Sequence, residues 1–571
     1  MRRVLTILVV GYLGVISPFF RAQPTESQDS PDQRFGITEA FWQPEEAVEL
    51  GVGWERILFY WREIQPDGPE DWNTLHVLEE WLVEADKQGR TVVGLLKNTA
   101  PWASEDGTEA GLPKGLTLPV DDPDNLWANF VRRVAEYYSV RNVHHWIIWN
   151  EPEINEGVYG YEFAGSVADY YQLLKVAYKV MKEVDPEAVI HLAGLTWWHD
   201  QTFLDQLLSE AAADPEAQDA GSFFDVISLH IYFRTETIQT VLEAVNRTQQ
   251  KFDLEKPVWI NETNAPPNRD PEWPVSRGNF RVDLEQQAWF ITQAFALGFA
   301  SGAERISVYK LIDIHLPEGG ESYGLMRPDF SRRPAFDAYA QTTKHLKGFT
   351  DVNLETWPSH YKVSFEKPGT TTHVLWSRTI TDTFVTLPSV KTRAMAISPD
   401  GREKEIFAEN GAFRISLDGA RCYGECIIGG PPIIVNVENV IAEQLEVFGE
   451  KSLEDVTIRA EVPQEINEYQ DLETPTPTII PTAKPTEPVQ SPSPTPQIME
   501  SATPISGQTA LAFVTPDNPE IEVGNQVFDQ ANSAESINQI SLPNISGLWF
   551  LTLAFILLIF LTVLVKRSRQ G

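Results

Sequence analysis

Short apolar segments alternate with amphipathic ones between residues 34 and 347. Amphipathic stretches such as LHVLEEWLVEADKQG, LWANFVRRVAEYYS, DYYQLLKVAYKVMKEV and LEQQAWFITQAFALGFA repeat apolar residues at helical spacing. The intervening apolar segments have the composition of buried strands: RFGIT, WERILFYW, TVVGLLKN, HHWIIWN, VIHLAGL, FDVISLHIY, PVWINE and RISVYKLI. This alternation predicts a parallel sheet with crossover helices, and eight such units predict a (β/α)8 barrel, an α/β fold.

The pattern changes after the barrel, over residues 348–440. Short alternating runs such as YKVSFEK, THVLWS, TFVTLP and AFRISLD are separated by turn-forming segments such as SPDGRE. They predict a small all-β sandwich. A structural accessory role is the first interpretation of this domain, and carbohydrate binding is the alternative.

Both ends of the chain predict export and membrane attachment. Residues 1–23 have a basic start and an apolar stretch, which is typical of a signal peptide, although an uncleaved N-terminal anchor is an alternative. Residues 548–565 carry no charge and are long enough to span a bilayer. The basic residues in 566–571 predict a cytoplasmic tail, so we expect a single-pass protein of the cell membrane with an extracytoplasmic body.

Residues 462–546 separate the body from this predicted transmembrane helix. The segment is rich in proline and threonine, for example in TPTPTIIPTAKPTEPVQSPSPTPQ. Such a composition favours extended chain and cannot bury enough apolar surface to fold. We therefore predict a disordered stalk.

Composition narrows the range of partners. A net charge of −36 argues against nucleic acid, because binding to phosphates needs basic patches. The 17 tryptophans suit stacking on sugar rings, although most are expected in the core. No cluster of His, Asp or Glu at ligand spacing suggests a metal, so we expect no metal and no cofactor. Cys422 and Cys426, the only cysteines, are expected to form a disulfide in an exported protein.

Two carboxylates stand at the ends of apolar strands. Glu151 follows the fourth strand in IIWNEP, and Glu262 ends the seventh in KPVWINE. A buried carboxylate is costly unless it is paired or used, and in a barrel the carboxyl ends of all strands meet at one mouth. Two carboxyl groups at one site are what glycoside hydrolysis requires. The alternative is that each makes an unrelated loop or salt-bridge contact.

WNEP at strand four and NE at strand seven resemble the large clan of retaining (β/α)8-barrel glycosidases, which includes cellulase-like, mannanase-like and xylosidase-like families. The resemblance covers residues 34 to about 347. It implies that Glu151 is the acid/base, Glu262 the nucleophile and Asn150 a donor to the sugar 2-hydroxyl. It also implies that the configuration is retained, with the two carboxyl groups roughly 5 Å apart.

Three further residues fit the clan's substrate site. His230 and Tyr232, in SLHIY, fall on one face of strand six and resemble the clan's histidine and tyrosine, which contact the substrate and the nucleophile. Arg56, in WERILFYW, resembles the arginine that keeps the nucleophile charged. The alternatives are a structural histidine and a surface ion pair.

Aromatic residues near the strand ends are candidate sugar platforms. About half of the five candidates are expected in the core, and Trp102 and Trp197 are predicted substrate-binding residues: the five are Trp102, Trp197, Trp198, Trp42 and Trp61. Lys310 and Asp313 stand near the end of strand eight, where the clan often has a tryptophan, so the sequence departs from the common pattern there. His144 and His145 precede strand four and should lie at the opposite end of the barrel.

These observations predict a surface-anchored glycosidase that cleaves a β-linked oligo- or polysaccharide with retention. A non-catalytic carbohydrate-binding or adhesive protein on the same barrel is one alternative. A transglycosylase that remodels surface polysaccharide is another. The sequence leaves open the sugar, the choice between endo and exo action, and the oligomeric state.

Overall fold

The structure is a computed structural model that describes residues 30–158, 160–275, 282–314, 322–422 and 427–438. The predicted signal peptide, the stalk at 462–546, the span at 548–565 and the tail lie outside these residues and stay predictions. Cys426 also lies outside them, so its pairing with Cys422 stays a prediction. Among the helices that the structure describes, none combines the length and the apolar character needed to cross a membrane.

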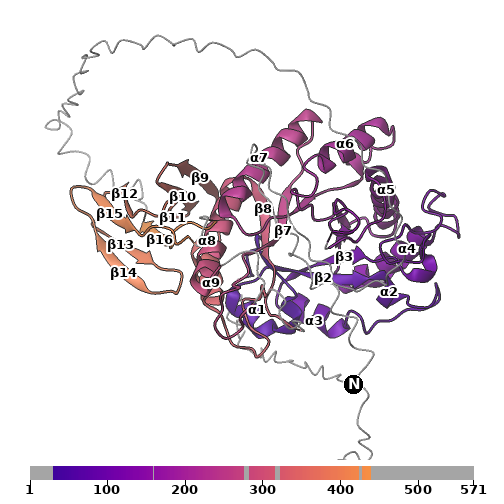
Figure 1. Ribbon diagram of the computed structural model, residues 1–571, viewed down its shortest axis with the longest axis horizontal. Helices are drawn as coiled ribbons and strands as arrows, with labels where there is room; N and C mark the ends of the chain where they lie inside the picture. The colour runs from indigo at the N-terminus through magenta and orange to yellow at the C-terminus, as the bar shows by residue number, and fades with distance from the viewer. Residues whose placement is uncertain (1–29, 159, 276–281, 315–321, 423–426, 439–571) are drawn as a thin grey trace, which may run out of the picture. The chain divides into compact units, whose positions relative to one another are not determined.

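A sheet of eight parallel strands confirms the predicted barrel (Figure 1). The strands hydrogen-bond in the order β5-β4-β3-β2-β1-β8-β7-β6. Parallel bridges at His191–Val226 and Leu195–Leu229 join the two edge strands, so the sheet is nearly closed. The strands are β1 (Phe35–Thr38), β2 (Trp54–Tyr60), β3 (Thr91–Lys97), β4 (His145–Ile148), β5 (Val189–His191), β6 (Ile227–His230), β7 (Val258–Thr263) and β8 (Ala303–Val308).

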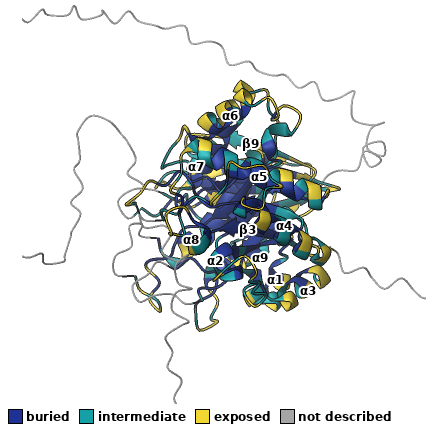
Figure 2. Ribbon diagram, turned by 90° about the vertical axis from the view of Figure 1, so that its right-hand side faces the viewer, coloured by how far each residue is buried: buried dark blue, intermediate teal, exposed yellow. Residues whose placement is uncertain are grey.

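Helices surround this sheet, with their buried faces toward it and their exposed faces outward (Figure 2). The α-helices are α1 (Pro44–Leu50), α2 (Trp61–Ile64), α3 (Glu79–Lys87), α4 (Leu126–Tyr138), α5 (Val167–Val184), α6 (Phe203–Ala213), α7 (Thr235–Lys251), α8 (Leu284–Ala300) and α9 (Pro334–Leu346). Short 3-10 helices occupy several loops: Ala40–Trp42, Pro101–Ala103, Ser139–Arg141 and Gly221–Phe223.

The helix ends follow the sequence closely because capping residues fix them. Ser166 and Asp169 form a reciprocal capping box at the start of α5, and Asp283 and Gln286 do the same for α8. Each box satisfies backbone N–H groups that the first turn of a helix leaves unpaired. These caps therefore set where the chain leaves the loops that follow β4 and β7.

The residues after the barrel form two antiparallel sheets, which confirms a β domain. One sheet has the order β14-β13-β16-β11-β10-β9 and the other pairs β12 with β15. Apolar side chains such as Leu375, Val385 and Phe413 make a small core shared by both sheets. The strands are β9 (Asp351–Thr356), β10 (His360–Lys367), β11 (Thr370–Ser377), β12 (Thr383–Pro388), β13 (Arg393–Ile397), β14 (Glu403–Phe407), β15 (Ala412–Leu417) and β16 (Ile433–Glu438).

The β domain packs against helix α8. The Gln293 side chain donates to the Gly430 carbonyl at 2.8 Å, and the Gln286 side chain donates to the Arg421 carbonyl at 2.7 Å. This contact explains why α8 is apolar around most of its circumference: barrel strands cover one side and the β domain covers part of the other.

Candidate active site

Glu151 lies just beyond the end of β4, in a backbone bend. Trp149 and Glu151 both have positive φ values, 74° and 41°, which is unusual for residues with a side chain. Conformations of this kind cost on the order of 1–3 kcal/mol and persist where the surroundings enforce them. The Tyr170 hydroxyl donates to the Ile148 carbonyl at 3.0 Å, and the Trp149 indole donates to the Glu162 carbonyl at 3.0 Å. The bend therefore presents a Glu151 that is only 1% exposed.

Glu262 lies within β7 and is 3% exposed. The Arg56 guanidinium, from β2, forms an ion pair with one of its oxygens, and the Tyr232 hydroxyl donates to the other. Strands β6 and β7 shift register between Leu229 and His230, which brings His230 opposite Glu262. Arg56 and Tyr232 thus both contact Glu262, whereas His230 lies opposite Glu262 in the sheet.

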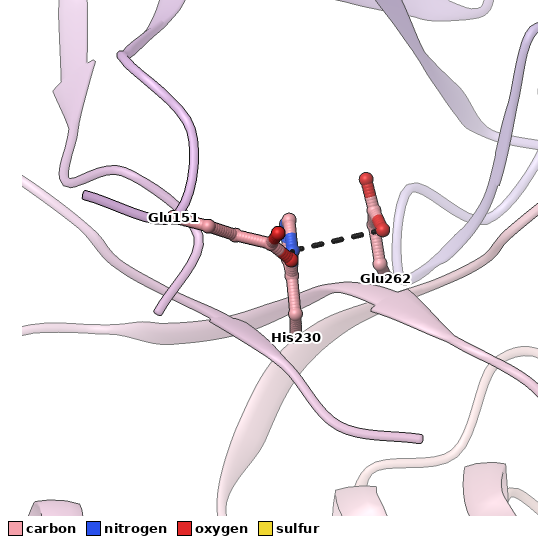
Figure 3. Close-up of side chains that lie close together, drawn as sticks. All are labelled: Glu151, His230 and Glu262. Atoms are coloured by element: carbon pink, nitrogen blue, oxygen red, sulfur yellow. Dashed lines mark hydrogen bonds and ion pairs between the residues drawn. The ribbon is translucent and has the colours of Figure 1, made fainter. Parts of the chain in front are cut away.

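His230 lies between the two glutamates (Figure 3). Its Nδ1 atom is 2.5 Å from Glu151 Oε1 and 3.6 Å from Glu262 Oε2. One ligand atom from each of the three residues can be chosen so that all lie within 4.8 Å of one another. The two carboxyl groups predicted from strands four and seven therefore share one buried site.

The two carboxyl groups have opposite electrostatic environments. Burial, followed by the charges of Glu262, Glu153 and Glu162, raises the pKa of Glu151 well above its ordinary value. Burial also acts to raise the pKa of Glu262, but the charge of Arg56, with His230 and Tyr232, outweighs it and lowers that pKa. The surroundings thus favour the protonated form of Glu151 and the ionised form of Glu262, which is the division that an acid and a nucleophile require.

His230 itself stays neutral at neutral pH. Burial lowers its pKa to about 4, against the opposing charge of Glu262. A neutral imidazole can hydrogen-bond to a protonated carboxyl without adding charge to the site. Gly194, after β5, makes room for the ring, because a Cβ at this position would lie 2.0 Å from His230 Nε2.

Asn150 contacts Glu162, which is paired with Lys97, and sequence reasoning missed both of these charged residues. Its Nδ2 donates to Glu162 Oε2 at 3.0 Å, and Lys97 Nζ lies 2.5 Å from Glu162 Oε1. Lys97 is the last residue of β3, so a charge ending an apolar strand, the signal that identified Glu151, was present in the sequence there too. Glu162 lies in a loop, where no pattern marks it.

Glu153 is a second missed carboxylate, two residues after Glu151. It is 5% exposed and accepts hydrogen bonds from the backbone and the hydroxyl of Thr196, the latter at 2.9 Å. Burial raises the pKa of Glu153 to about 7. These bonds join the loop after β4 to the loop after β5, which carries Trp197.

The candidate aromatic platforms differ in how far they are buried. Trp61 is fully buried and stacks on Phe130 at 4.8 Å, so it belongs to the core. Trp42 is 37% exposed, after β1. The other three follow β3 and β5 and pack partly buried against the core, so contact with sugar stays a prediction for Trp102, Trp197 and Trp198.

Lys310 and Asp313, which stand near the end of strand eight where the clan often has a tryptophan, make different contacts. Lys310 lies 3.6 Å from the Glu39 carboxylate, beyond the end of β1. Asp313 instead accepts from the backbone of Tyr323 and Gly324 and pairs with Arg333 at 2.7 Å. Arg333 also contacts Asp270 from the loop after β7 at 3.0 Å. Asp313 therefore belongs to a buried ionic network that ties two loops together.

The sequence predicts no metal at the site, and the contacts of the potential metal ligands there are relevant to this prediction. Glu151, His230 and Glu262 are the one group of three potential ligands that the described residues bring together. Both oxygens of Glu262 already accept bonds, and the Arg56 guanidinium beside it opposes a second cation. These contacts suit proton transfer better than metal binding, and the absence of a metal stays a prediction.

Comparisons with known proteins identify the fold. No family model matches the chain, and no curated protein sequence does. A solved family 39 glycoside hydrolase from the gut symbiont Bacteroides cellulosilyticus WH2 is similar at a TM-score of 0.55 and 16% identity, over 72% of this chain and 81% of that one. A glucosidase from Croceicoccus marinus is similar at a TM-score of 0.50 and 10% identity, over 72% of this chain and 97% of that one. The chain thus shares the (β/α)8 fold of solved glycoside hydrolases.

Proposed function

We propose that this protein is a glycoside hydrolase. The observation that carries the proposal is the pair of buried carboxyl groups with pKa values shifted in opposite directions, Glu151 upward and Glu262 downward. Protonation of a glycosidic oxygen needs the first state, and attack on the sugar carbon needs the second. The fold shared with solved glycoside hydrolases supports the same conclusion.

We propose further that the reaction retains the anomeric configuration. In retaining enzymes the carboxyl groups are about 5–5.5 Å apart, whereas inverting enzymes need about 6.5–9.5 Å to admit a water. Here carboxylate oxygens of Glu151 and Glu262 lie within 4.8 Å of each other. Glu262 would attack the anomeric carbon while Glu151 protonates the leaving oxygen, and Glu151 would then activate a water that releases the sugar.

The charges around the site favour an uncharged sugar. Three cations near the site are each matched by one carboxylate: Arg56 within β2 with Glu262, Lys97 with Glu162, and Lys310 with Glu39. With Glu151 protonated, these groups sum to zero. An acidic sugar would add an unmatched negative charge, so a neutral β-linked oligo- or polysaccharide is the proposed substrate. His230, Tyr232, Asn150, Trp102 and Trp197 are the proposed contacts.

The proposal includes attachment to the cell surface. It rests on the uncharged segment at 548–565, the basic residues that follow it and the proline-rich segment before it. An extracytoplasmic body would meet polysaccharide directly.

The deciding experiment measures turnover of aryl β-glycosides and neutral polysaccharides by the full-length protein and by Glu262→Ala. We expect the variant to lose at least about 10⁴-fold in kcat, because the covalent step has no nucleophile. Added azide should restore activity and give a glycosyl azide of inverted configuration. A loss below tenfold would overturn the assignment of Glu262.

The other outcomes separate the alternatives. Binding of a glycan without turnover would support the adhesive role. Transfer of the sugar to an added acceptor in preference to water would identify a transglycosylase. An azide product of retained configuration would exclude Glu262 as the nucleophile.

A further inference from the structure

We propose that Lys97 and Glu162 form a positioning pair for Glu151: together they fix the two residues before it and balance the charge beside it. This inference rests on the proposed function, because it assigns Glu151 the role of acid. Neither residue belongs to the motifs that identified the site.

The first support is the set of contacts that Glu162 makes. Its backbone carbonyl accepts from the Trp149 indole at 3.0 Å, and its Oε2 accepts from Asn150 Nδ2 at 3.0 Å. One residue thus holds both side chains that immediately precede Glu151. Because Trp149 and Glu151 have positive φ values, this stretch needs such contacts to keep its shape.

The second support is the position of Lys97. Its side chain is 2% exposed, and its Nζ lies 2.5 Å from Glu162 Oε1. A buried ammonium group is costly unless it is paired, so breaking the ion pair is unfavourable and the pair restrains the positions of both Lys97 and Glu162. Strands β3 and β4 are neighbours, with Leu96 opposite Ile148, so the pair bridges the end of one strand to the bend after the other.

The third support is electrostatic. The charge of Glu162 acts to raise the pKa of Glu151, whereas the charge of Lys97 acts to lower it. The other titratable groups that face Glu151 come from separate elements, β7, β6 and the loop after β4: Glu262, His230 and Glu153. Arg56 in β2 pairs with Glu262. The two members of the pair therefore influence the same proton in opposite directions.

The test compares Lys97→Met, Glu162→Gln and the double variant in the full-length protein. The measurement is the pH dependence of kcat/KM on phenyl β-glycosides, whose poor leaving group needs the acid. Loss of the ammonium should raise the pKa of Glu151 and move the alkaline limb up by on the order of one pH unit. Loss of the carboxylate should move it down, and the double variant should lie between the two.

The chain offers a matched control. Lys175 in α5 pairs with Asp214 at 2.6 Å, with side chains 16% and 15% exposed, in the helical layer around the barrel. Lys175→Met likewise removes an ammonium group that is paired with carboxylates, here Asp214 and Glu216. It should leave the alkaline limb unchanged, so a shift in this variant would point to general destabilisation.

The outcomes are distinct. Opposite shifts in the two single variants support the pair, whereas shifts in the same direction, or none, overturn it. Because a single variant leaves one buried charge unpaired and can lose stability, the double variant removes both charges and tests whether the limb returns. If no glycoside is turned over by wild type, the proposed function fails, and carbon-13 NMR titration of the Glu151 carboxyl, assigned with Glu151→Gln, still measures both shifts.

Discussion

Histidines lie at both ends of the barrel interior, but they have different neighbours. At the carboxyl ends of the strands His230 contacts Glu151 and lies near Glu262. At the opposite end His145 and His191 lie 3.1 Å apart, and both rings pack on Trp259. This agrees with the expected position of His145, at the start of β4.

The difference shows that a buried ionisable residue does not by itself define a site. Burial lowers the pKa of His145 to about 4, as it does for His230. Of these three histidines, only His230 contacts a carboxyl group. The two carboxyl groups near it, Glu151 and Glu262, have pKa values shifted in opposite directions. His145 and His191 form a neutral contact in a layer of side chains that includes Trp54 and Val93, and this contact stabilises the barrel.

The largest effect should come from Glu151→Gln. An amide keeps a hydrogen-bonding group near His230 but cannot release a proton. We expect kcat/KM on phenyl β-glycosides to fall about 10²–10⁴-fold, with the alkaline limb of the pH profile lost. The control is a 2,4-dinitrophenyl β-glycoside, whose leaving group needs no acid and whose glycosylation rate should change little. Equal losses on both substrates would contradict the role.

Arg56→Met should have the next largest effect. Without the guanidinium, burial dominates and the pKa of Glu262 rises, so the nucleophile becomes protonated at a higher pH. We expect a loss of about 10²–10³-fold, comparable to removal of one preorganised donor, and an acid limb displaced upward. A pH profile measured with the dinitrophenyl substrate isolates this limb. An unmoved acid limb would refute the assignment.

Gly194→Ala tests how closely the His230 ring packs against the backbone beside it. The added Cβ would meet His230 Nε2 at 2.0 Å, so the ring must shift. A displacement on the order of 1 Å near reacting groups can cost about 10²-fold, and we expect a loss up to that size. A comparison with Gly68→Ala, where nothing lies near the new Cβ and the backbone is not in the left-handed region, controls for the added methyl group. Equal activity in both variants would contradict the expectation.

The smallest effect on activity should come from substitution of His191, which lies with His145 at the opposite end of the barrel from the site. In His191→Leu, His145 loses its hydrogen-bonding partner inside the barrel, so the free energy of unfolding should fall by about 1–3 kcal/mol. The kcat/KM at 25 °C and both limbs of the pH profile should stay at wild-type values. Urea unfolding and a pH profile measure the two quantities. A displaced limb would show that the ends of the barrel are coupled.

The sequence predicted most of the barrel because its strands are apolar runs with sharp ends. Each of the eight predicted segments overlaps an observed strand, and α8 runs over Leu284–Ala300, as its sequence pattern indicated. Strand β9 was missed, since Asp351–Thr356 is mostly polar and lies at the edge of its sheet. Its alternation rests on two apolar residues, Val352 and Leu354, which pack partly buried against the core, and so short a pattern is weak evidence for a strand.

Site residues that interrupt or end an apolar strand could be predicted from the sequence, whereas those supplied by loops could not. Glu151, Glu262, Arg56 and His230 interrupt or end apolar runs, so their burial could be inferred from the sequence. Glu162 comes from a loop of mixed composition, and its contact with Lys97 spans 65 residues of chain. Nothing local in the sequence indicates a contact over that distance.

The seam between β5 and β6 has a consequence for folding. The regular sheet runs from β5 around to β6, and only isolated bridges, such as Leu195–Leu229, close it. The residues along this seam are also those of the site: Gly194 is bridged to Asn150 and packs on His230. A chain with every helix formed but an open seam would give a native-like circular dichroism spectrum and yet have no assembled site. Recovery of catalysis after refolding, rather than of helical signal, therefore reports that the barrel has closed.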